Sequence, residues 1–230
     1  MTQEHTDHGV RKPAWSHSHA PETVEFTPEF WDDRYRSAEQ IWSGEANPHL
    51  VTVATDLAPA TALDVGSGEG ADAIWLASRG WNVTGIDISQ VALDRAAARA
   101  VEAGADIAGR ITWQQADVLS WEPPKAQFDL VSAQFMHLPP ATLATLHAEL
   151  AAAVRPGGTL LIVGHHPSDL ETSVGRRHLH DLMFTADQIA ATLDATGWQI
   201  VATTPERSIL DPDGQLITIH DAVVRAVRRH

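Results

Sequence analysis

The sequence predicts an α/β fold: a doubly wound, mostly parallel sheet of seven strands in which the last strand is antiparallel. From residue 60 onward, short apolar runs alternate with helix-forming segments, which implies right-handed crossovers and helices on both faces of the sheet. A glycine-rich turn, LDVGSGEG at 63–70, joins the first run to the first helix. Near the end, DPDG at 211–214 separates two β-rich segments and predicts a hairpin, hence the antiparallel strand.

Each element is expected from its own residues. Runs rich in Val, Ile and Leu between turn residues predict strands, and segments closed by Gly80 and Gly104 predict helices. Strands are expected at 61–66, 81–89, 110–118, 127–135, 159–166, 198–206 and 215–227, and helices at 69–80, 90–104, 141–154 and 185–197.

Two regions are expected before this main domain, which spans 60–230. Residues 1–22 contain four histidines among polar residues and too little apolar surface to offset the entropy of ordering, so a disordered His-rich tail is predicted. Residues 23–59 predict a helical cap over the main domain, with helices at 26–42 and 48–58.

The composition narrows the class of protein. Thirty acidic residues against 16 basic ones give a net charge of -14, which disfavours nucleic acid and anionic membranes as partners. The absence of cysteine excludes disulfides, thiolate nucleophiles and Cys-based zinc sites, and a cytoplasmic protein is expected. No apolar run is long enough for a membrane span, and no feature indicates an oligomeric state.

The glycine turn has acids at both ends. Its spacing is G-x-G-x-G, whereas a dinucleotide site has G-x-G-x-x-G and offers backbone N–H groups to a diphosphate. Asp64 directly before the turn and Glu69 within it would place carboxylates against a phosphate, so they favour a cationic ligand without phosphate. Glu69 has a second interpretation as a first-turn acid that stabilises the helix dipole.

Acids also end the next two strands. Asp87 in GIDIS can accept hydrogen bonds from both hydroxyls of a ribose, and Asp117 in QQADV can meet an adenine amino group. Each is equally well explained as a turn or helix cap. Three acids at the carboxyl ends of three successive strands favour a nucleoside site.

Five motifs in order, LDVGSGEG, GIDIS, QQADV, QFDLVSA and LAAAVRPGGTLLIV, resemble the class I S-adenosylmethionine-dependent methyltransferases, which have a Rossmann-like fold. The segments FWDDRY and IWSGEANPHL are similar to the small-molecule thiopurine and tellurite-resistance type. The resemblance implies S-adenosylmethionine as cofactor and S-adenosylhomocysteine as product. The cofactor-binding residues that it implies are Asp64, Gly66, Ser67, Gly68 and Gly70 for the methionine part, Asp87 with Ile88 for the ribose, Asp117 with Val118 for the adenine, and Gln134.

Aromatic residues of the cap allow two interpretations. Trp31, Tyr35 and Trp42 either stack over the cofactor, where a sulfonium suits an aromatic ring, or form the buried core of the cap. Trp31 and Tyr35 are included among the candidate cofactor-binding residues.

Histidines follow the fourth and fifth strands. His137, His165 and His166 flank the expected substrate side and are candidate catalytic bases, although each is also explained as a loop residue. His178, His180 and Asp181 could join His165 or His166 around a metal ion, but no metal site is predicted.

The expected function is transfer of a methyl group to O, N or S, or to a chalcogen, of a small molecule by in-line displacement. Two alternatives remain open. One is a non-catalytic regulatory protein that binds the same cofactor. The other is an NAD-dependent oxidoreductase, which the glycine spacing disfavours.

Overall fold

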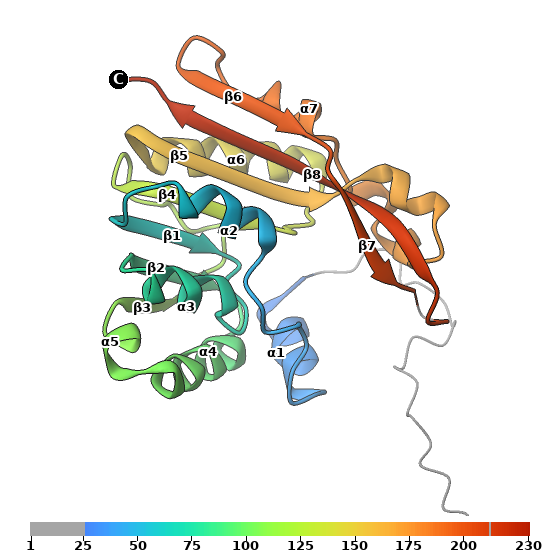
Figure 1. Ribbon diagram of the computed structural model, residues 1–230, viewed down its shortest axis with the longest axis horizontal. Helices are drawn as coiled ribbons and strands as arrows, with labels where there is room; N and C mark the ends of the chain where they lie inside the picture. Colours follow the sequence, from blue (N-terminus) through green and yellow to red (C-terminus); the bar gives the residue numbers. More distant parts are fainter. Residues whose placement is uncertain (1–25, 212) are drawn as a thin grey trace, which may run out of the picture.

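The computed structural model describes residues 26–211 and 213–230, with the side chains of Arg177 and His178 excepted (Figure 1). The predicted His-rich tail at 1–22 lies outside the described residues. Within them, no helix is both long and apolar enough to cross a membrane.

One mixed sheet forms the centre of the molecule, and its strand order is β3-β2-β1-β4-β5-β8-β6, with β7 paired to β8. Pairing is parallel from β3 to β5, and β8 runs antiparallel to β5, β6 and β7, so the expected antiparallel last strand is confirmed. The strands are β1 (Thr61–Val65), β2 (Asn82–Asp87), β3 (Ile111–Gln115), β4 (Phe128–Gln134), β5 (Val154–His165), β6 (Trp198–Thr203), β7 (Glu206–Leu210) and β8 (Leu216–Arg228).

Helices cover both faces of this sheet (Figure 1). The apolar sides of α2 and α3 pack with the sheet into one buried cluster around Leu76 and Leu161, and α6 and α7 pack into a second around Leu150 and Leu160. The helices are α1 (Pro28–Arg36), α2 (Pro48–Thr55), α3 (Ala71–Ser78), α4 (Gln90–Ala103), α5 (Ala105–Ala108), α6 (Pro140–Ala153), α7 (Ala186–Ala190) and the 3-10 helices η1 (Pro167–Glu171) and η2 (Arg176–Leu182). The doubly wound α/β prediction is confirmed.

Three elements of the structure differ from the predicted ones. The structure has an eighth strand, β7, because the turn at 211–215 pairs residues 206–210 with the first part of β8. The later part of β8 pairs with β6. The helix expected at 185–197 is ordered as α7 only over Ala186–Ala190. The helix expected at 26–42 ends at Arg36, and the chain continues as an irregular segment of turns and bends at 37–47 that we call the strap.

The strap crosses the carboxyl edge of the sheet. Its backbone N–H groups do not continue α1 because carboxylates of the main domain accept them: Glu69 accepts from Ile41 and Trp42, and Asp72 accepts from Asn47. The strap therefore joins α1 to α2 across the turn that follows β1.

Candidate functional site

The glycine turn has the left-handed backbone that its sequence indicates. Gly66, Gly68 and Gly70 have φ values of +69°, +52° and +83°, which side chains rarely tolerate. A Cβ on Gly70 would lie 2.8 Å from the Cβ of Ala96 and from the ring of Trp113, so α4 and β3 also require glycine there. The turn is thus fixed by conformation and by close packing.

Asp87 ends β2 directly beside this turn and is 8% exposed. Its Oδ2 accepts the Gly68 N–H at 2.8 Å, and its Oδ1 accepts the Ser89 N–H at 2.9 Å. Burial raises the pKa of Asp87, and these N–H donors counteract the rise. Each carboxylate oxygen keeps a lone pair, so Asp87 both anchors the turn and can accept further donors.

Asp64 and Asp72 form an acidic pair beside the glycine turn. Burial raises the pKa of Asp64 well above its usual range, with the nearby carboxylates of Asp72 and Asp87 adding to the effect. Asp72 accepts the Asn47 N–H at 2.6 Å and Nε2 of Gln134 at 2.7 Å, and burial raises its pKa to about 6. Sequence reasoning missed Asp72, although an acid in the first turn after the glycines was a visible signal.

Buried polar atoms without partners surround the turn. Among the described residues, Oδ2 of Asp64, Oγ of Ser67 and Oε1 of Gln134 are buried and have no hydrogen-bond partner. Such atoms are costly unless a ligand or solvent satisfies them. A carboxylate oxygen, a hydroxyl and an amide oxygen can all accept hydrogen bonds. They fit a ligand that carries an ammonium group and other N–H or O–H donors.

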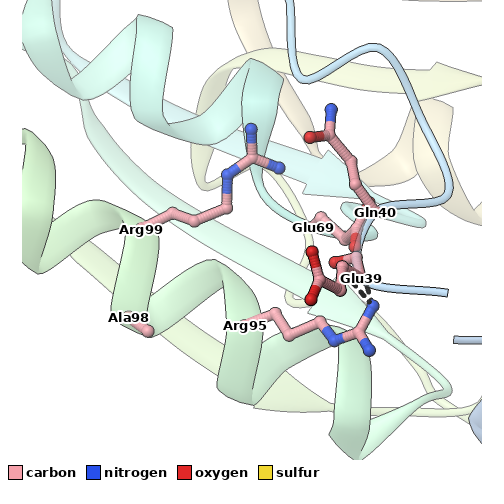
Figure 2. A pocket seen from close by; sticks show the side chains of 6 residues that line it. All are labelled: Glu39, Gln40, Glu69, Arg95, Ala98 and Arg99. Carbon is pink, nitrogen blue, oxygen red and sulfur yellow. Dashed lines mark hydrogen bonds and ion pairs between the residues drawn. The ribbon is translucent and has the colours of Figure 1, made fainter. Parts of the chain in front are cut away.

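Glu69 is buried, and its carboxylate has partners within the protein. Its Oε2 accepts the N–H groups of Ile41 and Trp42 at 3.1 and 3.3 Å, and its Oε1 pairs with Nη1 of Arg95 at 3.1 Å (Figure 2). Glu69 therefore anchors the strap to α4, and its part in selecting a cationic ligand stays a prediction. An open pocket nearby is lined by Glu39, Gln40, Glu69, Arg95, Ala98 and Arg99, and none of these is a predicted cofactor-binding residue (Figure 2).

Of the aromatic residues of α1, Tyr35 lies against the glycine turn. Tyr35 is buried, and its hydroxyl accepts Nε1–H of Trp42 at 3.1 Å and lies 3.0 Å from the place a Cβ of Gly68 would occupy. Burial raises the pKa of Tyr35, so it stays protonated. Trp31 stacks with Phe26 at a centroid distance of 5.9 Å. Tyr35 thus belongs to the buried core of the cap while also contacting the turn.

Three further predicted residues follow β2 and β3, namely Ile88 for the ribose and Asp117 with Val118 for the adenine. Oδ1 of Asp117 accepts the Leu119 N–H at 2.9 Å, as in the turn-cap interpretation. Val118 packs against the core next to α6, and the carbonyl of Ile88 accepts Nε2 of Gln115 at 3.1 Å.

The predicted histidines separate into two roles. His137 and His165 stack at a centroid distance of 4.8 Å, and Phe135 lies 4.5 Å from His165. Burial and the nearby Arg176 lower the pKa of His165 to about 2, so its ring is neutral and a weak proton acceptor. His166 instead caps η1, where its Nδ1 accepts the Ser168 N–H at 3.2 Å.

A charged group beside His165, here called the arginine cluster, consists of Asp169, Arg176, Arg207 and Asp221. Arg207 binds Asp221 through Nε at 2.6 Å and Nη2 at 3.2 Å, and Arg176 pairs with Asp169. Nδ1 of His165 lies 4.0 Å from Asp221, its partner in the β5–β8 ladder. Hydrogen bonding with Arg207 and with His49 of α2 keeps the pKa of Asp221 at about 2 despite its burial.

The metal alternative is not supported by the side chains that the structure describes. They contain no group of three or more His, Asp or Glu residues that could hold an ion. His180 pairs with Asp181 at 2.7 Å on the surface, and the side chain of His178 lies outside the described part.

Residues 62–158 match the protein family described as "Methyltransferase domain". A curated relative is 27-O-demethylrifamycin SV methyltransferase of Amycolatopsis mediterranei (strain S699), 33% identical over 139 residues, which are 58% of this chain and 48% of that protein. The chain therefore spans about half the length of this relative.

Solved structures match over most of the chain. One, described under "Conversion of a Disulfide Bond into a Thioacetal Group during Echinomycin Biosynthesis", has a TM-score of 0.68 and 23% identity and covers 88% of this chain and 92% of its own. TehB from Haemophilus influenzae has a TM-score of 0.65 and 17% identity and covers 88% and 67%. Both show a shared fold.

The fold and the family match over residues 62–158 support the resemblance to the class I S-adenosylmethionine-dependent methyltransferases that the sequence motifs predicted. The family match itself covers less than half of this chain. The likeness to TehB concerns the fold, so the thiopurine or tellurite-resistance type stays a prediction.

Proposed function

We propose that this protein transfers the methyl group of S-adenosylmethionine to an oxygen, nitrogen, sulfur or chalcogen atom of a small molecule. The observation that carries the proposal is the set of buried, unpartnered polar atoms around the glycine turn, on Asp64, Ser67 and Gln134. The family match and the 33% identical methyltransferase support the same activity.

The residues present fit this cofactor. The acidic pair of Asp64 and Asp72 would hold the ammonium of the methionine part, and Asp87 would accept the ribose hydroxyls. Ile88 would lie beside the ribose with Asp87, and Asp117 and Val118 would border the adenine. The bound cofactor supplies a methyl group on a positively charged sulfur.

The chain's own contribution is to position the acceptor and to exclude water. Trp31 and Tyr35 of α1 and the strap would cover the cofactor side. Phe135, His137 and His165 would line the acceptor side, where His165 is neutral and can orient an acceptor by hydrogen bonding. Since His165 is a weak proton acceptor, we infer an acceptor that arrives already ionised or loses its proton easily, or one for which His137 is the base.

Calorimetric titration tests the cofactor. S-adenosylmethionine and S-adenosylhomocysteine should bind and NAD should not, because an acidic turn repels a diphosphate. Binding of NAD alone would overturn the proposal in favour of an oxidoreductase.

A turnover screen tests the reaction. Thiols, phenols, amines and chalcogen oxyanions are incubated with S-adenosylmethionine, and S-adenosylhomocysteine is measured, with the Asp87→Ala variant as the matched control. Cofactor-dependent product in one class is expected. Binding without turnover in every class would favour the regulatory alternative.

The domain boundaries belong to the same proposal. Deleting residues 1–22 should leave binding and turnover unchanged. Deleting 1–45 should impair both, because α1 and the two N–H groups that bind Glu69 are then lost. If a protein that begins at residue 46 binds the cofactor as well as the full chain does, the proposed role of the cap is contradicted.

A further inference from the structure

In the arginine cluster the two arginine side chains are partly exposed, and the two carboxylates that pair with them are buried. The Asp169 and Asp221 side chains are 0% and 1% exposed, whereas those of Arg176 and Arg207 are 14% and 34% exposed. The charges cancel within each pair, but the groups that reach the surface are N–H donors. His49 and His165, 20% and 14% exposed, border the same surface.

Both guanidiniums have donors left over. Arg207 uses Nε and Nη2 on Asp221, and Arg176 uses Nη1 on Asp169; among the described residues they make no other hydrogen bond. A guanidinium has five N–H donors in a planar fork that matches a carboxylate. The two forks therefore keep free N–H groups on one surface beside the end of β5.

The surroundings favour an anion at this place. Burial is the main cause that lowers the pKa of His165 to about 2; among its charged neighbours Arg176 lowers it most, His137 and Arg207 add to this, and Asp221 opposes them. An exposed acid, Glu206, lies 3.7 Å from Nε2 of His220, and its side chain is 74% exposed. The exposed arginine donors belong to a chain of net charge -14, so they are a local feature rather than a consequence of composition.

The cluster adjoins the acceptor side of the site. His165 ends β5, stacks with His137 of the segment after β4, and pairs in the ladder with Asp221. Arg176 begins η2 and Arg207 lies in β7, and both elements extend past the carboxyl ends of the parallel strands (Figure 1).

We propose that Arg176 and Arg207 anchor the methyl acceptor, and that this acceptor is a small organic acid held by its carboxylate. The inference rests on the proposed methyl transfer and names its substrate class. The carboxylate is the handle for binding, and the methylated atom is elsewhere on the same molecule. Arg176 and Arg207 are then specificity-determining residues.

The test uses matched acids and amides on the wild-type protein. After saturation with S-adenosylhomocysteine, the protein is titrated with 4-hydroxybenzoate and 4-hydroxybenzamide, and with acetate and acetamide, by calorimetry and NMR. Each acid should bind at least about tenfold more tightly than its amide, since a charged partner strengthens a hydrogen bond. Equal binding of acid and amide, or no binding of either acid up to roughly 10 mM, would overturn the inference.

The order of addition separates two further outcomes. An acid that binds only before S-adenosylhomocysteine is added would assign the arginines to the cofactor carboxylate and would overturn an acceptor site. Failure of S-adenosylhomocysteine itself to bind is read in the first titration and would overturn the proposed function, on which the acceptor's role rests.

Variants add a second measurement. Arg207→Gln should weaken binding of 4-hydroxybenzoate by about tenfold and leave binding of S-adenosylhomocysteine unchanged. Arg155→Gln is the matched control, because Arg155 pairs with Asp129 at 2.8 Å outside this cluster. Equal effects of the two variants on acid binding would contradict the inference. Should Arg207→Gln fail to fold, the comparison of acids with amides on the wild-type protein is the deciding test.

Discussion

Replacing Asp72 by Asn should make the ligand-free protein more stable at neutral pH and weaken its cofactor binding. Asp72 is an acid whose pKa is raised by burial from 3.8 to about 6. The folded state therefore holds this proton more tightly than the unfolded chain does. Its stability falls as the pH rises from about 3.8 through about 6, and the full penalty applies above that range.

The magnitude follows from the shift. The difference of about two pKa units corresponds to an upper bound of about 3 kcal/mol above pH 6. The variant keeps an oxygen for the Asn47 N–H, now 2.6 Å away, but its terminal NH2 replaces the oxygen that accepts Nε2 of Gln134, and the loss of this hydrogen bond costs about 1 kcal/mol. Asp72→Asn should then gain about 2 kcal/mol at about pH 7.5 and nothing at about pH 4, where Asp72 itself is largely neutral.

Urea unfolding followed by circular dichroism at the two pH values measures this gain. Asp94→Asn, which removes an exposed acid on α4, is the matched control and is measured at the same two pH values. Calorimetry on the same samples should show weaker binding of S-adenosylhomocysteine by Asp72→Asn, because a carboxylate near the ammonium is lost. A stability difference that is the same at both pH values would refute the reasoning.

Three further predictions use the same turn. Asp87→Ala should weaken S-adenosylhomocysteine binding by about 1.5–3 kcal/mol in calorimetry, as hydrogen bonds to a charged group are lost, and unchanged affinity would show that the ribose assignment is wrong. Glu69→Gln should speed amide hydrogen exchange of Ile41 and Trp42 by about tenfold, because these N–H groups lose a charged acceptor; an unchanged rate would contradict the anchoring of the strap. Gly70→Ala should destabilise by at least about 2 kcal/mol in urea, more than Gly175→Ala, since φ is positive at both positions but only the Gly70 methyl would meet packed atoms. Equal losses would show that strain alone matters.

The sequence predicted the parts of this structure that depend on local patterns. The apolar strands, the alternation of strands and helices, and the antiparallel last strand follow from periodicity and turn residues. Asp64 and Asp87 were found because they lie at the ends of strands next to the glycine turn. Elements that owe their form to distant partners were missed. The strap is held in place by Glu69 and Asp72, which accept its N–H groups from 25 to 28 positions away.

The acceptor side shows the same limit more strongly. His165 was noticed as a histidine at a strand end, but its pKa is lowered first by burial and then by Arg176, which no spacing in the chain connects to it. His49 and Asp221 form a hydrogen bond across 172 positions. Only the three-dimensional arrangement reveals that both Glu69 and Asp72 bind the strap, while Asp72 also accepts a hydrogen bond from Gln134.

The place of β8 inside the sheet has a consequence for how the chain is synthesised and folded. β6 and β7 both attach to the sheet through β8, which follows them in the chain. Until residues 216–228 have left the ribosome, β5 has a bare edge and β6 has no strand to pair with. A nascent chain stalled before that point exposes unpaired strand edges that invite aggregation, so the late strand makes completion of the sheet a single, last step.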